Sequence, residues 1–515
     1  MCSTVAANTA FIDISTFTAL EAYIYGGPAS INWFLASFQK SNWFSFIPIS
    51  VRHTGVFDFG QSSAVATFNR SADYILNVWF RCVLPQIMLN PLRTGTAIPN
   101  FPVLNTDATL RYTNFPMHNL FESIQIQFNE LSVQKFSSAW LDNRFMFTTD
   151  AAKRLGYRNM IGDIDAFVGP KLQGDPVGHG GYLNLPLPFF FAEDSGVALP
   201  MTALPYNDVR ITYTIRPFSQ LIVIDPGTIT TPVGAPGPTR NPTLADVVLV
   251  GTATTTLVSG VPVTTYASGG TNFRLIDPCT FVHAAVVHED ERAKIGQCPR
   301  DILIFQIQEA QQAPLRNLDA TITFDLRFSY AIVALFFSVR NDTIFSVSGS
   351  ITPPYPAPYN NSVTAGQFGR DWSNYTTNVD KNIGFDPIDT ATLYYDNTQR
   401  FSMGADYFST VAPWYWCKAI PEDTGYHIYS YALHPFDLLT PSGSTNYSKL
   451  ANVSIAYEMS PVAHLASQNP PLDINQFTTI TYGGVNAIYK GTHILLALSL
   501  NLLRFAGGSV GFPSL

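Results

Sequence analysis

Charged residues are scarce in this sequence. Asp, Glu, Lys and Arg make up 13% of the 515 residues, whereas hydrophobic residues make up 46%. Ordinary soluble domains carry about 25% charged residues, and disordered chains combine low hydrophobicity with high charge. The composition therefore argues against a disordered chain. Because a surface that is poor in charge usually lies against a partner, the sequence favours a folded, oligomeric protein over a free monomer.

Clusters of basic residues are also missing. The chain has 29 Lys and Arg against 37 Asp and Glu, which gives a net charge of −8, and it has no run of Lys or Arg. A protein that binds the phosphates of nucleic acid needs clustered positive charge. We therefore predict no direct contact with nucleic acid.

Cysteines are few and scattered. The odd set of five has no Cys-x-x-Cys spacing and comprises Cys2, Cys82, Cys279, Cys298 and Cys417, which indicates free thiols in a reducing compartment. Residues 1–10 lack the basic and apolar regions of a signal peptide. The longest apolar stretches, 328–339 and 494–503, are shorter than the ~20 residues that span a bilayer. These features predict a soluble, cytoplasmic protein.

Helical periodicity is rare. Residues 18–25, where Thr18 and Glu21 fit a capping box, and residues 144–155 are the candidate helices. Apolar and polar residues instead alternate with a period of two, which is typical of strands with one buried face. Four such strands are predicted at 124–128, 209–215, 322–328 and 453–459. Strands at this density, separated by 36 Pro and 34 Gly, indicate β-sandwiches or barrels.

One composition change divides the chain. Residues 225–242 are rich in Pro, Gly and Thr, which is typical of a linker. We therefore expect an N-terminal segment with a short helix at 1–27, a first β-domain at 28–225, a linker at 226–244 and a second β-domain at 245–515. A single core rarely grows past about 250–300 residues, so each half has a plausible size for one sandwich.

Motifs for enzymatic chemistry are incomplete. Residues 507–511 match the G-x-S-x-G pattern, but that nucleophile needs Asp and His later in the chain. We expect a flexible tail there. His288-Glu289 begins like a zinc-protease motif, but Arg292 replaces the second His. The acidic run at 289–291 indicates a solvated charged turn or an intersubunit salt bridge. The sequence predicts no catalytic, cofactor-binding or metal-binding residues.

Some aromatic and histidine residues stand out without forming a known site. His283, His427 and His434 are predicted to be hydrogen-bonded structural residues, because no second ligand lies at metal spacing. The run at 414–416 (WYW) fits buried packing, a subunit interface or a carbohydrate platform. The run at 189–191 (FFF) is predicted to plug the first sandwich or its junction with the second.

Several sequence blocks resemble the major capsid proteins of iridoviruses and related large DNA viruses. In the first half they are 11–14 (FIDI), 21–27 (EAYIYGG), 117–120 (MHNL), 156–163 (GYRNMIGD), 184–191 (NLPLPFFF), 194–200 (DSGVALP) and 203–211 (ALPYNDVRI). In the second half they are 288–292 (HEDER), 300–304 (RDILI), 429–433 (YSYAL) and 443–446 (GSTN). These blocks span nearly the whole chain in the family's order, while 228–270 and 346–378 depart from it.

The resemblance implies an all-β fold of two consecutive eight-stranded antiparallel jelly rolls, a double jelly roll, with few short helices. It also implies a homotrimer that forms a pseudo-hexagonal capsomer in the icosahedral capsid of a large double-stranded DNA virus. The expected location is the virion, after assembly in the host cytoplasm. The expected partners are further copies of the chain, minor capsid and penton proteins, and proteins of an internal membrane.

The same resemblance places residues 1–27 on the inner face of the shell, while the residues themselves leave docking onto the chain's own first jelly roll open. The Pro, Gly, Asn and Thr content of 228–270 and 346–378 predicts that these regions include exterior loops. Two other functions remain open from the residues themselves. One is a β-sandwich that binds carbohydrate on a virion surface or fibre, and the other is a β-sandwich hydrolase, against which the missing catalytic motifs argue.

Overall fold

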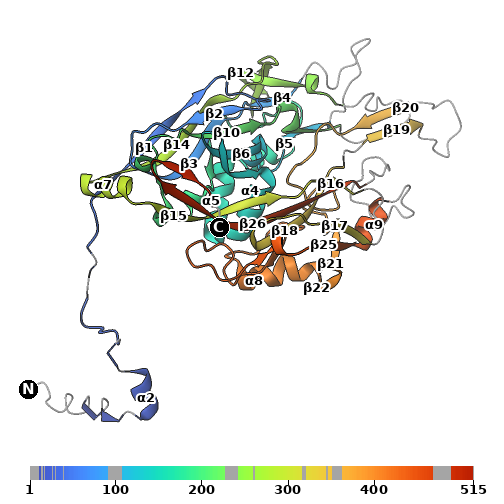
Figure 1. Cartoon of the computed structure of the whole chain (residues 1–515). Helices are drawn as coiled ribbons and strands as arrows, with labels where there is room; N and C mark the ends of the chain where they lie inside the picture. The colour runs from blue at the N-terminus through green and yellow to red at the C-terminus, as the bar shows by residue number, and fades with distance from the viewer. Residues whose placement is uncertain are drawn as a thin grey trace, which may run out of the picture. The chain divides into compact units, whose positions relative to one another are not determined.

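The computed structural model describes residues 11–90, 107–226, 242–258, 261–315, 321–343, 346–350, 362–467 and 489–513, apart from positions 13, 14, 17, 26, 29, 37 and 39. The chain forms two units, residues 1–43 and residues 44–515. The larger unit contains the β-sheets (Figure 1).

Eight strands of the larger unit form a first jelly roll. They are β1 (Phe44–Thr54), β2 (Ala64–Thr67), β3 (Tyr74–Val83), β6 (Phe121–Phe128), β7 (Leu131–Ser137), β8 (Leu183–Leu187), β10 (Val209–Ile215) and β14 (Ile276–Val287). One sheet has the order β1-β14-β3-β8 and the other has the order β2-β10-β6-β7. Strand β1 belongs to both sheets, since residues 44–51 pair with β14 and residues 52–54 pair with β2.

Eight later strands repeat this pattern. They are β15 (Arg300–Glu309), β17 (Thr321–Asp325), β18 (Ala331–Asn341), β21 (Ile388–Tyr395), β22 (Thr398–Gly404), β23 (His427–Ser430), β25 (Val453–Met459) and β26 (Gly491–Ala506). The sheets are β15-β26-β18-β23 and β17-β25-β21-β22. In both halves the first, eighth, third and sixth strands share one sheet, and the second, seventh, fourth and fifth share the other. This order confirms the predicted pair of eight-stranded jelly rolls.

Short elements decorate these sheets. The helices are α2 (Ala19–Ile24), α3 (Pro116–Leu120), α4 (Ser138–Thr148), α5 (Ala151–Ile161), α6 (Asp165–Val168), α7 (Glu289–Gln297), α8 (Ala412–Trp416) and α9 (Pro461–Ser467). The additional strands are β4 (Ile87–Leu89), β5 (Thr109–Tyr112), β9 (Leu199–Pro200), β11 (Ile222–Asp225), β12 (Val247–Val258), β13 (Val261–Ser268), β16 (Ala313–Pro314), β19 (Ser346–Ser350), β20 (Ser362–Gly366), β24 (Thr445–Asn446) and β27 (Ser509–Gly511).

The boundary between the jelly rolls lies later than the sequence predicts. Strand β14 follows the expected linker at 226–244, yet it pairs with β1 and β3 in the first jelly roll. Strand β12 likewise pairs with β4. The Pro- and Gly-rich segment therefore belongs to the connection between the seventh and eighth strands, because a long loop within a sandwich has the same composition as a linker. The chain passes between the jelly rolls at residues 288–299, where α7 lies.

Several local predictions are confirmed. Strands β10 and β25 cover the predicted ranges, and buried and partly buried residues alternate along all of β10. Thr18 and Glu21 form the predicted capping box at α2. The four cysteines in the described part of the chain are free. None of the helices described there is long and apolar enough to cross a membrane.

Other local predictions are wrong. The single helix expected at 144–155 is two helices, because the Asp150 side chain accepts a hydrogen bond from the backbone of Ala152 and caps α5. The C-terminal end, expected as a flexible tail, pairs β27 with β26 through the described residue 511. Gly507 and Gly508 form the turn with φ of +60° and +80°, which glycine adopts without steric cost.

The two jelly rolls share a hydrophobic core. Trp140 of α4 packs against Phe336 of β18 with ring centroids 5.3 Å apart, and Phe147 packs against the same ring at 5.7 Å. Gln134 of β7 connects the halves further, because its amide nitrogen donates to the carbonyl oxygen of Phe305 at 3.0 Å. A continuous core of this kind holds the two jelly rolls in one arrangement.

A polar junction accompanies the shared core. Trp372 of the second half stacks against Arg216 of the first half and Arg370, with distances of 4.3 and 3.9 Å from guanidinium carbon to ring centroid. Its indole nitrogen donates to the carbonyl oxygen of Gln220 at 2.8 Å. Next to it, Asp371 accepts hydrogen bonds from the backbone and side chain of Asn114. Burial raises the pKa of Asp371, so these donors offset a large desolvation cost.

We expect Trp372→Ala to lower the free energy of unfolding by about 2–4 kcal/mol, because it removes packing and leaves the buried Arg216 guanidinium without its aromatic partner. The matched control is Phe385→Ala, an aromatic residue that is 62% exposed and should change stability by less than about 0.5 kcal/mol when truncated. Denaturant titration followed by circular dichroism measures both. Equal effects of the two substitutions would contradict the assigned role of Trp372.

Candidate assembly surfaces

The motifs that suggested chemistry do not form an active site. Ser509 lies on the β26–β27 hairpin rather than on a strand-to-helix turn. Residues 289–291 begin α7, whose Arg292 forms an ion pair with Asp73 within the same chain at 2.8 Å. The described residues contain no group of three or more His, Cys, Asp or Glu side chains that could hold a metal ion.

The histidines behave differently from one another. His427 is buried and hydrogen-bonds Asp386 at 2.8 Å, as predicted for a structural residue. His283 is exposed on β14 and packs against Trp79 with ring centroids 4.7 Å apart. His434 is also exposed. The prediction is therefore wrong for His283, which faces outward because side chains alternate along the strand.

A buried histidine network was missed in the sequence. His118 contacts the Asp142 carboxylate at 2.7 Å through Nδ1 and the Tyr157 hydroxyl at 2.8 Å through Nε2. Tyr375 of the second half donates to the other Asp142 oxygen at 3.3 Å. Burial raises the pKa values of both tyrosines. His118 and Asp142 are sealed from solvent, so this group binds α3, α4 and α5 to the second half and has no open position for a substrate.

The aromatic runs separate into buried and exposed groups. Phe189, Phe190 and Phe191 are fully buried in the shared core, which confirms the predicted plug. Trp414 and Tyr415 on α8 are 70% and 68% exposed, which is incompatible with buried packing within one chain. Large exposed aromatic side chains are typical of surfaces that contact a partner.

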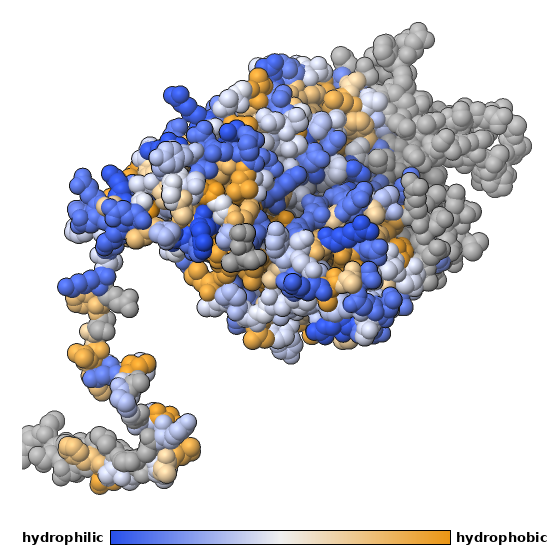
Figure 2. Space-filling model, in the orientation of Figure 1, coloured by the Kyte–Doolittle hydropathy of each residue, from blue (hydrophilic) through white to orange (hydrophobic). Residues whose placement is uncertain are grey.

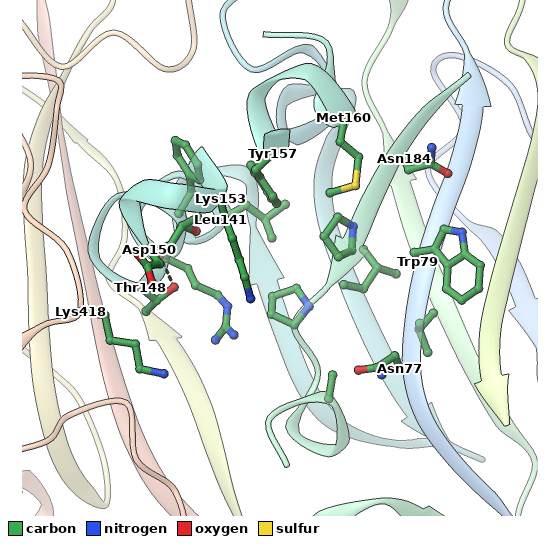
Figure 3. A pocket seen from close by; sticks show the side chains of 18 of the residues that line it. Asn77, Trp79, Leu141, Thr148, Asp150, Lys153, Tyr157, Met160, Asn184 and Lys418 are labelled. Atoms are coloured by element: carbon green, nitrogen blue, oxygen red, sulfur yellow. Dashed lines mark hydrogen bonds between the residues drawn. The ribbon is translucent and has the colours of Figure 1, made fainter. Parts of the chain in front are cut away.

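A cleft of about 790 Å³ opens between strands β3 and β8 and helices α4 and α5 of the first half. Figure 3 shows Trp79 and Asn184 on its sheet wall and Lys153 and Tyr157 on its helical wall. Lys418 of the second half completes the lining, and its side chain points into the cleft (Figure 3). The cleft thus combines aromatic walls with ammonium groups.

The N-terminal unit is rich in exposed hydrophobic side chains. They are Phe11, Ile12, Leu20, Tyr23, Ile24, Tyr25, Ile31, Trp33, Phe34, Leu35, Phe38 and Trp43. Figure 2 shows hydrophobic side chains along this segment. The six-residue helix α2 is too short to be stable alone, so we interpret residues 1–43 as a segment that needs a partner surface.

Comparison with known proteins decides the family. Residues 291–511 match the family described as large eukaryotic DNA virus major capsid protein, and residues 32–247 match the family described as major capsid protein N-terminus. A major capsid protein of Costelytra zealandica iridescent virus is 37% identical over 527 residues, which cover 99% of this chain and 98% of that protein. The chain belongs to the major capsid proteins of large eukaryotic DNA viruses.

Other major capsid proteins support the same assignment. That of Invertebrate iridescent virus 3 is 36% identical and covers 99% of both chains. The PBCV-1 virus capsid protein has a TM-score of 0.61 at 18% identity, with 94% of this chain and all of that chain covered. The Faustovirus major capsid protein has a TM-score of 0.60 at 14% identity, with 98% of this chain and 97% of that chain covered. These two structures share the double jelly roll.

Family membership settles the predicted class of function. Major capsid proteins are structural proteins of the virion, so this chain is a capsid component and not an enzyme. Nothing in the comparisons supports the alternative of a carbohydrate-binding module. The exposed surfaces described above are therefore candidates for contacts between capsid subunits.

Proposed function

We propose that three copies of this major capsid protein form a pseudo-hexagonal capsomer and that such capsomers tile an icosahedral shell. The observation that carries the proposal is the repeated strand order of two jelly rolls that are joined by a shared hydrophobic cluster. Two similar domains in each of three chains give six similar corners, which suit a hexagonal lattice. Closed rotational symmetry is also the usual arrangement of homo-oligomers.

The surface composition supports an extensive interface. The low charged fraction and the exposed aromatic residues Trp414 and Tyr415 fit contacts of an obligate assembly, which bury on the order of thousands of Å². We assign residues 1–27 to the inner face of the shell, where minor capsid, penton or internal-membrane proteins are the partners. Assembly takes place in the host cytoplasm in this proposal.

Exterior loops complete the proposed arrangement. We assign 228–270 and 346–378 to regions that include the outer surface, because their Pro, Gly, Asn and Thr content favours loops. The end of the second region is an exception, since Asp371 and residues 373–376 are buried. The β12–β13 hairpin fits this role, since residues 252–257 are exposed. Residues 227–241 and 351–361 lie outside the described part of the chain.

We expect the full-length protein at micromolar concentration to have three times the chain mass of 56.7 kDa. Each chain supplies two jelly rolls, so a ring with six corners needs three chains. Light scattering coupled to size-exclusion chromatography measures this mass. A stable monomer or dimer under these conditions would rule out the proposed capsomer.

We expect deletion of residues 1–16 to leave trimers intact but to reduce their assembly into closed shells severalfold. The reason is that the N-terminal unit is separate from the jelly rolls, so their folding does not depend on it. Light scattering reports the trimer, and electron microscopy of particles reports the shells. Normal shell yield from the truncated protein, or labelling of this end on the outside of intact particles, would contradict the inner-face assignment.

A further inference from the structure

Helix α7 is held in its chain mainly by polar contacts, namely the His288 cap and the Arg292–Asp73 ion pair. It has nine residues, and none of them is buried. A helix this short is marginal in water and usually depends on tertiary packing. The ion pair from Arg292 to Asp73 at 2.8 Å ties it to β3, and Figure 1 shows α7 at the periphery of the larger unit. The helix therefore presents an accessible surface to a neighbouring molecule.

The first turn of α7 is strongly acidic. Glu289, Asp290 and Glu291 follow one another there, and Glu289 and Asp290 are exposed. Within the chain, His288 Nδ1 lies 3.4 Å from the Asp290 carboxylate, and the Arg292 guanidinium is engaged with Asp73. The exposed end of the helix thus presents carboxylates to solvent.

The cleft beside α4 and α5 presents the opposite charge. Among the described residues, no carboxylate lies within ion-pair distance of the Lys153 or Lys418 ammonium groups that line it. Arg144 in the cleft is paired with Glu193 at 2.7 Å. Asp150 also lines the cleft, but its side chain caps α5. Two lysines are therefore available for carboxylates brought by another molecule.

The residues around the cleft are those that contribute most to protein interfaces. Trp79 and Tyr157 line it, and the exposed Trp414 and Tyr415 lie on α8, which ends two residues before Lys418. Aromatic side chains next to basic groups are typical of the energetically dominant part of an interface. The cleft therefore suits a protein segment with an acidic, solvent-exposed end.

We infer that the acidic first turn of α7 in one copy docks into the cleft of the next copy in the homotrimer. The inference rests on the proposed trimer. A three-fold ring needs a heterologous interface, in which two different patches of each copy meet. The acidic turn of α7 and the basic cleft are two such patches, and their opposite charges favour this pairing over contacts between like patches.

Reciprocal charge reversal in the full-length protein tests the inference. The cleft variant is Lys153→Glu with Lys418→Glu, the helix variant is Glu289→Lys with Asp290→Lys, and the fourfold variant combines them. The control is Arg327→Glu with Lys449→Glu, which changes net charge like the cleft variant at exposed positions outside the cleft. Mass spectrometry measures subunit exchange between isotope-labelled and unlabelled trimers, and circular dichroism checks folding.

We expect the cleft and helix variants each to exchange subunits about tenfold faster than the unaltered trimer or more, because like charges then face each other. The fourfold variant should return to within about threefold of the unaltered rate, since the opposite charges are restored with their places exchanged. The control should match the unaltered protein, and all variants should keep its circular dichroism spectrum.

The outcomes separate this inference from the proposed function. If the unaltered protein is a trimer and neither reversal accelerates exchange, the docking of α7 is wrong and the trimer stands. The same conclusion follows if the control is accelerated equally or if the fourfold variant is not restored. If the unaltered protein is a monomer, the proposed capsomer fails and the inference fails with it.

Discussion

The structure depends on the desolvated junction between its two jelly rolls. Arg216 donates to the backbone carbonyl oxygens of Asn119 and Phe121 and to Ser138 while stacking on Trp372. Arg216 is buried, and this burial lowers the pKa of its guanidinium to about 10, because the cation loses hydration. A buried cation of this kind is costly to separate from its partners. The two jelly rolls therefore keep one relative arrangement, and the chain presents them as a single block.

The surface of the protein exposes side chains of three kinds. Exposed side chains in the described part of the chain include Trp414 and Tyr415 on α8, hydrophobic residues between 11 and 43, and Glu289 and Asp290 on α7. Each kind suits a different contact. Aromatic and charged groups give a specific interface between copies, whereas a hydrophobic segment in a separate unit suits attachment to another surface. A capsid protein needs both kinds of contact.

The sequence predicted best what short-range patterns determine. Alternation identified β10 and β25, and the Thr18–Glu21 spacing identified the cap of α2. The domain boundary was missed because β14 joins strands more than 190 residues away, such as Cys279 with Arg81, and no local pattern reports such a pairing. The His118–Asp142–Tyr375 network was missed for the same reason, since Tyr375 lies 233 residues from Asp142. The jelly-roll connectivity came from resemblance alone and was correct.

The central claim is that two fused jelly rolls act as one rigid block that repeats around a three-fold axis. Electron cryomicroscopy of the purified oligomer at side-chain resolution tests it most directly. The account predicts three copies around one axis, six jelly-roll corners and Trp372 between Arg216 and Arg370 in every copy. Two-fold symmetry, or jelly rolls that differ in relative orientation from copy to copy, would contradict it.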